Sequence, residues 1–258
     1  EGRWLTETDI ENSDATVRAR VIPLQTWLDD VEVSAGTLIL IRDLTELRDR
    51  DRQLVTKDAT IREIHHRVKN NLQTVAALLR LQSRRMSNSD AKDALKQAMG
   101  RVSAIAVVHE ILSQNFEEQV AFDEVADRIL HMVGDVAASS GSVVARREGS
   151  FGEVPAETAT ALSLATTELC QNAIEHSLDS SSGNVIVRSH RTDDALVVDI
   201  VSDGKPLPEG FSLDNHRSSL GLSIVTTLMQ DLGGTFTLED NSDRVGTCAR
   251  LVIPLQRL

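Results

Sequence analysis

The sequence predicts a multidomain α+β protein in which a β-rich segment is followed by a helical hairpin and then by an α/β sandwich. The chain has 258 residues, more than one small hydrophobic core uses. Residues 1–42 are rich in β-branched residues, whereas the stretch that begins at Thr45 is dense in charge and has no early Gly or Pro. From Phe116 onward, amphipathic helical patterns alternate with short apolar runs that are typical of strands.

The bulk composition is that of an ordinary water-soluble protein. It is 41% hydrophobic and 26% charged, with a net charge of −12. This acidity argues against a general nucleic-acid or membrane-surface binder, because phosphate-rich partners need a basic face. Cys170 and Cys248 show neither disulfide nor metal-site spacing, so we expect a reducing, cytoplasmic location. No apolar run approaches the roughly 18 residues of a membrane span and no signal peptide is recognisable, and we expect a chain that begins at Glu1 to be a fragment.

The N-terminal segment is expected to form two or three antiparallel strands. The run ATVRARVIPL alternates in places, and GTLILIRDLTE is a short apolar run opened by Gly36. About 40 residues are too few for an independent core. We therefore expect this segment to be the end of a larger domain.

Two long helices are predicted next. A continuous helix begins at Thr45 and becomes apolar-periodic near Ile61. A second helix is expected over Ala91–Ser113, after the turn SNSD, with Ser89 or Asp90 as its N-cap. Two such helices form a hairpin that buries its seam poorly alone. We expect two copies to pair into a four-helix bundle, which makes the protein a homodimer.

The C-terminal part predicts helices packed on one face of a mixed sheet. Helical patterns are FDEVADRILHMVGDV, SLGLSIVTTLMQDLGG and PAETATALSLATTELCQNAIEHSL, which has Pro155 near its first turn. Strand patterns are GSVVARRE, TFTLED, TCARLVIPL and the hairpin NVIVRSHRTDDALVVDIVSDG, which turns at TDD. Residues 116–258 are therefore expected to form one layered unit.

A pair of histidines lies in the stretch REIHHRVKNNLQTV. Ile61, His65, Val68 and Leu72 follow one another at steps of four, three and four residues, so His65 falls on the apolar seam. His66 lies one residue further, about 100° round the helix, and joins a polar face. We therefore interpret His65 as a seam histidine and His66 as exposed.

The exposed His66 is a candidate nucleophile. A neutral imidazole can attack a phosphoryl group, and much of the imidazole is unprotonated at pH 7. Nearby Arg67 and Lys69 favour the neutral ring and could stabilise phosphate charge. Glu63, three residues earlier, could accept or orient the ring proton. A solvated helix face on which the histidine is incidental explains the same stretch equally well.

A second polar cluster is expected in the C-terminal unit. The run ELCQNAIEH places Glu168, Asn172 and His176 at i, i+4 and i+8 on one helix face. Such a set could hold a metal–phosphate group, because amide oxygens suit Mg²⁺. An ordinary polar helix face is the alternative. Gly204 in SDGKPLPEG and Gly221 in SLGL could let the backbone approach phosphate.

Together these pieces resemble a known family. The C-terminal unit resembles the GHKL ATP-binding fold that histidine kinases share with DNA gyrase, with TELCQNAIEH as its N box, SDGKPLPEG and SLGLSIV as its G1 and G2 regions, and VGTCARLVIP as its last strand. HHRVKNNLQ resembles the phosphoacceptor helix of the HWE-related sensor histidine kinases, whose motif is His-Arg-x-Lys-Asn, and RVSAIAVVHEIL resembles its second helix. Residues 1–45 resemble the end of a PAS domain, with RDLTEL at its exit.

The resemblance implies a division of the chain and its cofactors. Residues 1–44 would be the PAS-like sensor segment, 45–60 a helical signalling linker, 61–115 the dimerisation and phosphotransfer hairpin, and 116–258 the ATP-binding domain. The implied cofactors are ATP and Mg²⁺.

The same resemblance implies the roles of the site residues. His66 would be phosphorylated, Asn172 would coordinate Mg²⁺, and Glu168 would support the γ-phosphate end of the nucleotide. Asp203 and Gly204 would face adenine. The positions that match nucleotide-binding parts of the family are Asn172, His176, Asp203, Gly204, Leu220, Gly221, Leu222 and Thr247, and those beside the acceptor are Glu63, Lys69 and Asn70.

The G1 and G2 regions depart from the family pattern, which runs Asp-x-Gly-x-Gly in G1. Ser202 stands at the expected aspartate, Asp203 lies one place later, and Pro206 replaces the second glycine. The G2 region keeps only Gly221 of its usual glycines. Phe211 is the sole aromatic residue of a short lid.

The sequence thus predicts a cytoplasmic sensor protein-histidine kinase that phosphorylates His66 from ATP and passes the phosphoryl group to an aspartate of a response regulator. The resemblance implies a regulator of the RNA-binding antiterminator type, with no direct nucleic-acid contact by this chain. The His109–Glu110 pair lies in the second helix and is interpreted as structural. Two alternatives remain open. One is a pseudokinase scaffold, suggested by Ser202 and Pro206, and the other is a non-kinase GHKL ATPase, disfavoured by the short lid and by His66.

Overall fold

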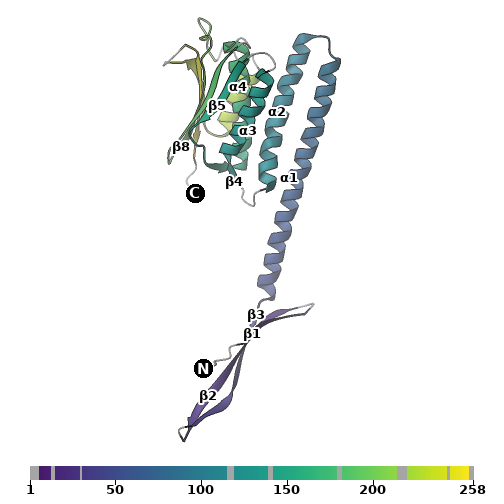
Figure 1. The fold of residues 1–258 in the computed structure, drawn as a ribbon, viewed down its shortest axis with the longest axis vertical. Helices are drawn as coiled ribbons and strands as arrows, with labels where there is room; N and C mark the ends of the chain where they lie inside the picture. The colour runs from purple at the N-terminus through teal and green to yellow at the C-terminus, as the bar shows by residue number, and fades with distance from the viewer. Residues whose placement is uncertain are drawn as a thin grey trace. The chain divides into compact units, whose positions relative to one another are not determined.

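The computed structural model describes residues 6–12, 15–29, 31–114, 119–138, 142–178, 182–213, 220–242 and 245–255. The chain divides into two compact units, Glu1–Ile61 and Arg62–Leu258. The boundary falls inside helix α1, Thr45–Arg85, which begins in the first unit and continues into the second (Figure 1). Each unit contains its own β-sheet.

The first unit is built on an antiparallel sheet of three strands in the order β1-β2-β3, which confirms the strands expected there. Helix α1 begins directly after β3, where the Asp43 carboxylate accepts a hydrogen bond from the Thr45 amide at 2.9 Å. Hydrogen bonds from Thr45 lower the pKa of Asp43. The strands are β1, Thr6–Glu11, β2, Thr16–Leu28, and β3, Val31–Asp43.

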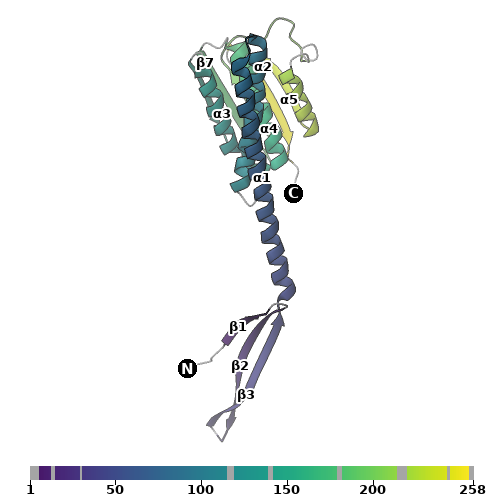
Figure 2. The same ribbon diagram turned by 90° about the vertical axis from the view of Figure 1, so that its right-hand side faces the viewer.

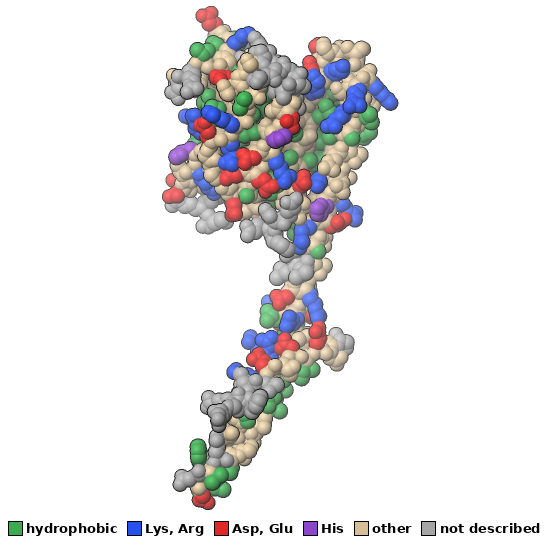
Figure 3. Space-filling view, in the orientation of Figure 1, with side chains coloured by type: hydrophobic (Ala, Val, Ile, Leu, Met, Phe, Trp, Pro, Cys, Tyr) green, Lys and Arg blue, Asp and Glu red, His purple; other side chains and the backbone are tan. Residues whose placement is uncertain are grey.

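Many apolar side chains of this three-stranded sheet are exposed. Trp27 is 70% exposed and Ile41 is 69% exposed. Figure 3 shows apolar side chains on the surface of this part of the molecule. A sheet with this much exposed apolar surface needs a further layer to cover it.

The helical hairpin consists of α1 and α2, Ser89–Gln114, as predicted. The N-cap prediction is wrong by one residue. The Asn88 side-chain oxygen accepts hydrogen bonds from the amides of Asp90 at 2.8 Å and Ala91 at 3.3 Å. The Ser89 hydroxyl instead contacts the Asp90 carboxylate. Asn88 caps the helix because its short side chain reaches two of the amides that the first turn leaves without a partner.

The C-terminal part of the second unit is a mixed sheet in the order β5-β7-β8-β10-β9, in which β5 and β7 are parallel and the other pairs antiparallel. Helices α3, α4 and α5 cover one face of this sheet, as predicted (Figures 1 and 2). The elements are β4, Gln119–Ala121, α3, Phe122–Ala138, β5, Ser142–Glu148, β6, Glu153–Pro155, α4, Ala156–Asn172, η1, Ala173–Ser177, β7, Ser182–Arg191, β8, Ala195–Ser202, α5, Leu220–Asp231, β9, Thr235–Asp240, and β10, Thr247–Pro254.

The core lies between the sheet and these helices. Strand β8 alternates between buried and half-buried residues, so Leu196, Val198 and Ile200 face the helices. Leu162 and Leu169 of α4 belong to the same buried cluster. The polar residues of α4 are therefore carried by a helix that is fixed on its apolar side.

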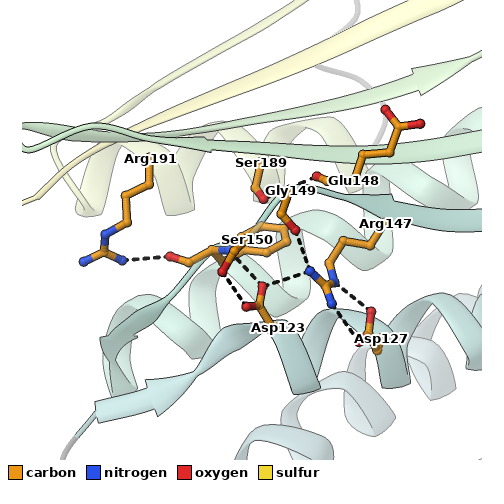
Figure 4. A network of polar contacts seen from close by, with 9 residues as sticks. Asp123, Asp127, Arg147, Glu148, Gly149, Ser150, Ser189 and Arg191 are labelled. Atoms are coloured by element: carbon orange, nitrogen blue, oxygen red, sulfur yellow. Dashed lines mark hydrogen bonds and ion pairs between the residues drawn. The ribbon is translucent and has the colours of Figure 1, made fainter.

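A polar network joins α3 to the loop that follows β5 (Figure 4). Arg147 of β5 binds the Asp127 carboxylate through two hydrogen bonds of 2.7 and 3.0 Å. Asp123 accepts hydrogen bonds from the Ser150 hydroxyl at 2.6 Å and the Phe151 amide at 2.8 Å. The network holds the loop against the first turn of α3 and closes the core over the Phe151 ring, which is fully buried.

Acidic and basic side chains are mixed over the surface of the second unit (Figure 3). Within the described ranges, no helix combines the length and the apolar character needed to cross a bilayer.

Candidate functional site

Helix α4 carries the predicted N-box residues. It begins directly after Pro155, whose φ of −56° suits a helix start and whose missing N–H costs no helical hydrogen bond. After Asn172 the helix widens into the π-helical turn η1, which the sequence analysis did not predict. Glu168 and Asn172 lie four residues apart on regular α-helix. His176 lies in the wider turn, where α-helical spacing no longer defines a common face, and it is exposed.

Glu168 is 3% exposed, and its carboxylate is bound by an arginine of helix α2. The Arg101 guanidinium of α2 donates two hydrogen bonds to this carboxylate, at 2.6 and 2.9 Å. The contact with Glu168 raises the pKa of Arg101, so this cation stays charged at any physiological pH. The sequence analysis did not identify Arg101. Its only signal is a lone basic residue in the apolar run AMGRVSAIAVV.

Asn172 and Gly221 complete this cluster. The Asn172 side-chain nitrogen is buried and has no hydrogen-bond partner among the described residues. A Cβ atom on Gly221 would lie 2.7 Å from Glu168 Oε2 and 3.6 Å from Asn172 Nδ2, so only glycine fits there. The predicted N-box and G2 residues are therefore adjacent. A partnerless buried N–H donor beside a glycine suits an anionic acceptor such as a phosphate oxygen, and the amide oxygen of the same side chain is a type of ligand that Mg²⁺ accepts.

The G1 residues lie at the end of strand β8. Ser202 is buried, and its hydroxyl is 2.9 Å from the hydroxyl of Thr247 on β10. The exposed Asp203 carboxylate accepts hydrogen bonds from the backbone and side-chain nitrogens of Asn184, at 2.7 and 2.5 Å. Gly204 follows directly and is half-buried. The structure thus brings Thr247 to Ser202 and directs Asp203 towards β7.

The lid is described only in part. Ser218 and Ser219 of the predicted G2 region lie outside the described residues. Leu220, at the first position of α5, is exposed, and Leu222 and Phe211 are half-buried. A separate polar cavity of about 400 Å³ lies on the helix-free face of the sheet, lined by Arg146, Glu148, Asn184, Ile186, Arg188, Val201, Ser202, Asp203 and Asn241.

On helix α1 the two histidines divide as predicted. His66 is exposed, whereas His65 is half-buried and faces α2. The Nδ1 atoms of His65 and His109 are 3.0 Å apart, and the ring centroids are 5.2 Å apart. Burial, and then the proximity of His65, lower the pKa of His109. The sequence placed His65 on the seam, but it gave no sign that a second histidine would be its partner.

The residues near His66 make contacts of their own. Glu63 accepts a hydrogen bond from Arg67 at 2.7 Å. Lys69 lies 3.4 Å from the Glu110 carboxylate on α2, and Asn70 is exposed. Glu110 also lies 3.4 Å from Arg128 of α3, which supports the structural interpretation of the His-Glu pair.

Comparison with known proteins gives two family matches. The family described as "Histidine kinase" (HisKA_2) matches residues 63–137. The family described as "Histidine kinase-, DNA gyrase B-, and HSP90-like ATPase" (HATPase_c) matches residues 157–257. The first covers the helical hairpin and α3, and the second covers α4 and the strands and helix that follow it.

Several known proteins are similar over most of the chain. Sensor histidine kinase PdtaS of Mycobacterium tuberculosis is 48% identical over 252 residues, which are 96% of this chain and 49% of that protein. PdtaS of Mycolicibacterium smegmatis is 45% identical over the same shares. The chain therefore spans about half the length of the PdtaS proteins that it matches.

A solved structure has a similar fold. The histidine kinase domain of the blue-light-activated kinase EL346 from Erythrobacter litoralis is 26% identical and superposes with a TM-score of 0.54, covering 80% of this chain and 94% of that chain. With a histidine kinase match over the hairpin, an ATPase match over the α/β unit and 48% identity to a sensor histidine kinase, the chain belongs to the sensor histidine kinase family, in its HWE-related class.

Proposed function

We propose that this chain is the kinase core of a two-component sensor, which phosphorylates His66 from ATP and then passes the phosphoryl group to an aspartate of a response regulator. The observation that carries the proposal is the cluster of Glu168, Asn172 and Gly221, in a chain whose hairpin presents His66 to solvent. A cluster that includes a buried, partnerless amide is built to bind a polar ligand.

Each residue has a distinct part in the proposed reaction. A ring nitrogen of His66 attacks the γ-phosphorus, a P–N bond forms, and the bond from that phosphorus to the β,γ-bridging oxygen breaks, so that ADP leaves. Glu168 is the candidate to polarise or accept the ring proton. Asn172 would hold Mg²⁺, which when bound neutralises phosphate charge. Catalysis would rest mainly on positioning and charge neutralisation.

The adenine end of the nucleotide is assigned to the G1 residues. Asp203 and Gly204 would face the base, with Thr247 beside them on β10. His176, Leu220 and Leu222 are assigned to the rest of the nucleotide site. This assignment rests on the resemblance of SDGKPLPEG to the G1 region; in the structure both oxygens of the Asp203 carboxylate accept hydrogen bonds from Asn184 of β7.

A homodimer is proposed from the second apolar stripe of α1. Ile64, Leu78 and Leu81 are each more than half exposed, although they belong to the predicted hairpin. A second copy could cover this stripe and complete a four-helix bundle. The proposed domains are a PAS-like segment over 1–44, a linker over 45–60, the hairpin over 61–115 and the ATP-binding domain over 116–258.

The partner and the location follow from the family. We propose a response regulator of the RNA-binding antiterminator type and a cytoplasmic location. The net charge of −12 supports the view that nucleic acid is contacted by the regulator and not by this chain.

The test is to incubate the protein with γ-labelled ATP and Mg²⁺, beside His66→Gln, His65→Gln and Asn172→Ala. We expect a label that is stable to alkali and labile to acid, lost in the His66 and Asn172 variants and kept in the His65 variant. ATP hydrolysis without label would support the ATPase alternative. If the wild type neither labels nor binds nucleotide, the kinase proposal is wrong for this chain, and Ser202→Asp becomes the first variant to make.

A further inference from the structure

Helix α2 of the hairpin contacts helix α4 of the ATP-binding domain through polar residues around Arg101. Further along α2 the packing is apolar, since Val108 and Ile111 belong to the same buried cluster as Leu162 of α4. Arg101 binds Glu168, and Gln97, one turn earlier on α2, donates a hydrogen bond of 3.3 Å to Glu175. Between them the helices are in close contact, since a Cβ on Gly100 would lie 2.5 Å from a Gln171 side-chain nitrogen. The ATP-binding domain is therefore docked on α2 through the same helix face that carries Glu168.

In this docked arrangement Glu168 and the acceptor histidine, His66, lie at different positions along the hairpin. The contact between His65 and His109 marks the part of α2 that lies beside the acceptor turn. Arg101 precedes His109 by eight residues (109 − 101), which at about 1.5 Å per residue is roughly 12 Å along the helix. A phosphoryl donor must come within about 3–3.5 Å of its acceptor. A nucleotide held at Glu168 in this arrangement would be displaced along the hairpin from His66.

The same contact occupies the carboxylate. Arg101 takes up both oxygens of Glu168 in a fork that is among the stronger polar contacts in proteins. The fork takes two of the roughly four lone-pair sites of the carboxylate and pairs its charge with a cation, so fewer sites remain for an imidazole proton. In the docked arrangement Glu168 is therefore neutralised as well as displaced.

The docked arrangement also leaves polar groups unsatisfied. Asn172 Nδ2 and Gln171 Oε1 are buried without a hydrogen-bond partner among the described residues. A buried polar group without a partner is destabilising. The ion pair between Arg101 and Glu168 stabilises the docked arrangement, whereas these unpaired groups destabilise it. A small change in either contribution would therefore shift the equilibrium between the docked and the released arrangement.

We propose that Arg101 is an autoinhibitory latch: its ion pair with Glu168 docks the ATP-binding domain on α2, and phosphorylation of His66 requires that this pair break. The latch rests on the proposed function, because it assigns a regulation to the same catalytic site. Any signal that turns or shifts α2 against α4 would act on the kinase through this pair.

The first test is the initial rate of His66 labelling from γ-labelled ATP in the full chain. Arg101→Ala and Arg101→Gln are expected to label at least about 10-fold faster than the wild type, because the ion pair that holds Glu168 is lost. Lys96→Ala is the matched control, since Lys96 lies on the same helix and pairs only locally with Asp93; its rate should equal that of the wild type. Wild-type or slower labelling in both Arg101 variants overturns the latch.

A disulfide trap tests the docking without removing Arg101. Gln97→Cys combined with Glu175→Cys should be bridged through two disulfides by a short bis-methanethiosulfonate reagent, because the native side chains meet only at their ends. The bridged, oxidised protein should label several-fold more slowly and recover on reduction. Burial raises the pKa of the Cys170 thiol to about 12, so this native thiol competes poorly. The single cysteine variants serve as controls. Equal labelling of oxidised and reduced protein overturns the latch, whereas absence of label in the wild type itself overturns the proposed function and the latch together.

Discussion

Helices α1 and α4 both carry candidate site residues, but they are enclosed to very different degrees. Ten residues of α4 are buried, Glu168 among them. In the part of α1 that belongs to the second unit, Ser83 is the only buried residue among those described. A buried functional group is positioned by its neighbours, so substitutions on α4 should change packing and chemistry together. An exposed group such as His66 should be removable without loss of stability.

The largest effect is expected beside α4, from Gly221→Ala. The new methyl group would lie 2.7 Å from Glu168 Oε2 and 3.6 Å from Asn172 Nδ2, so it would fill space beside the two residues assigned to the phosphate end of the nucleotide. We expect His66 labelling to fall by about 10- to 100-fold, because small displacements in a reacting site have effects of this size. The melting temperature should also fall by several degrees, as overpacked cores do.

Gly134→Ala is the matched control for this prediction. Gly134 lies in helix α3, and nothing lies within 4 Å of the position of an added Cβ. Alanine is the better helix former by up to about 1 kcal/mol. The control should therefore keep its labelling rate and melt at the same or a higher temperature. If the Gly221 variant labels as fast as the wild type, the α4 site tolerates substitution as the exposed α1 face is expected to, and the predicted difference between the two helices is wrong.

On α1, Leu78→Glu should separate assembly from folding. Leu78 is 56% exposed, so the charge is well solvated in a single copy. If a second copy covers this stripe, the buried charge should weaken dimerisation at least about 10-fold, measured by sedimentation equilibrium. Val144→Glu, on the equally exposed Val144 of β5, should leave the dimer intact. An unchanged dimer in the Leu78 variant would place the interface elsewhere.

A smaller effect, dependent on pH, is expected where α1 meets α2. The pKa of His109 is lowered by burial and by His65, so the folded protein favours the neutral ring. The unfolded chain binds more protons below its ordinary value of about 6.5, so stability should fall as the pH drops through this value. His109→Gln should flatten the fall in melting temperature between pH 7.5 and pH 5.5. His190→Gln, at an exposed position on β7, is the control and should keep the wild-type slope.

The smallest effect is expected at the start of α2. Asn88→Ala removes the side chain that caps two amides and should cost about 1 kcal/mol, or a few degrees in melting temperature. Ser89→Ala, one residue later, should change neither. If Ser89→Ala lowers the melting temperature more than Asn88→Ala does, Ser89 is the N-cap, as the sequence suggested.

Much of the fold could be predicted because it depends on local patterns. The strands β5, β7, β8, β9 and β10 alternate with period two, and α3, α4 and α5 bury one face. The cap at Asn88 was not predicted, because Asn88, Ser89 and Asp90 can all cap a helix. The π-helical turn after Asn172 was not predicted, because no residue in that stretch marks a change of helix type. The site residues Glu168, Asn172 and Gly221 were found through motifs that stand in order along the chain.

The sequence by itself determined which segments are helix or strand, that His65 lies on a seam and His66 on a polar face, and which family the chain resembles. Only the tertiary structure decided which polar groups meet. Arg101 and Glu168 are 67 residues apart, and His65 and His109 are 44 apart. Periodicity is read over three or four residues, whereas these pairs depend on how two helices are rotated and shifted as their apolar faces pack. The position of a single arginine or histidine in the sequence therefore does not predict its partner on another helix.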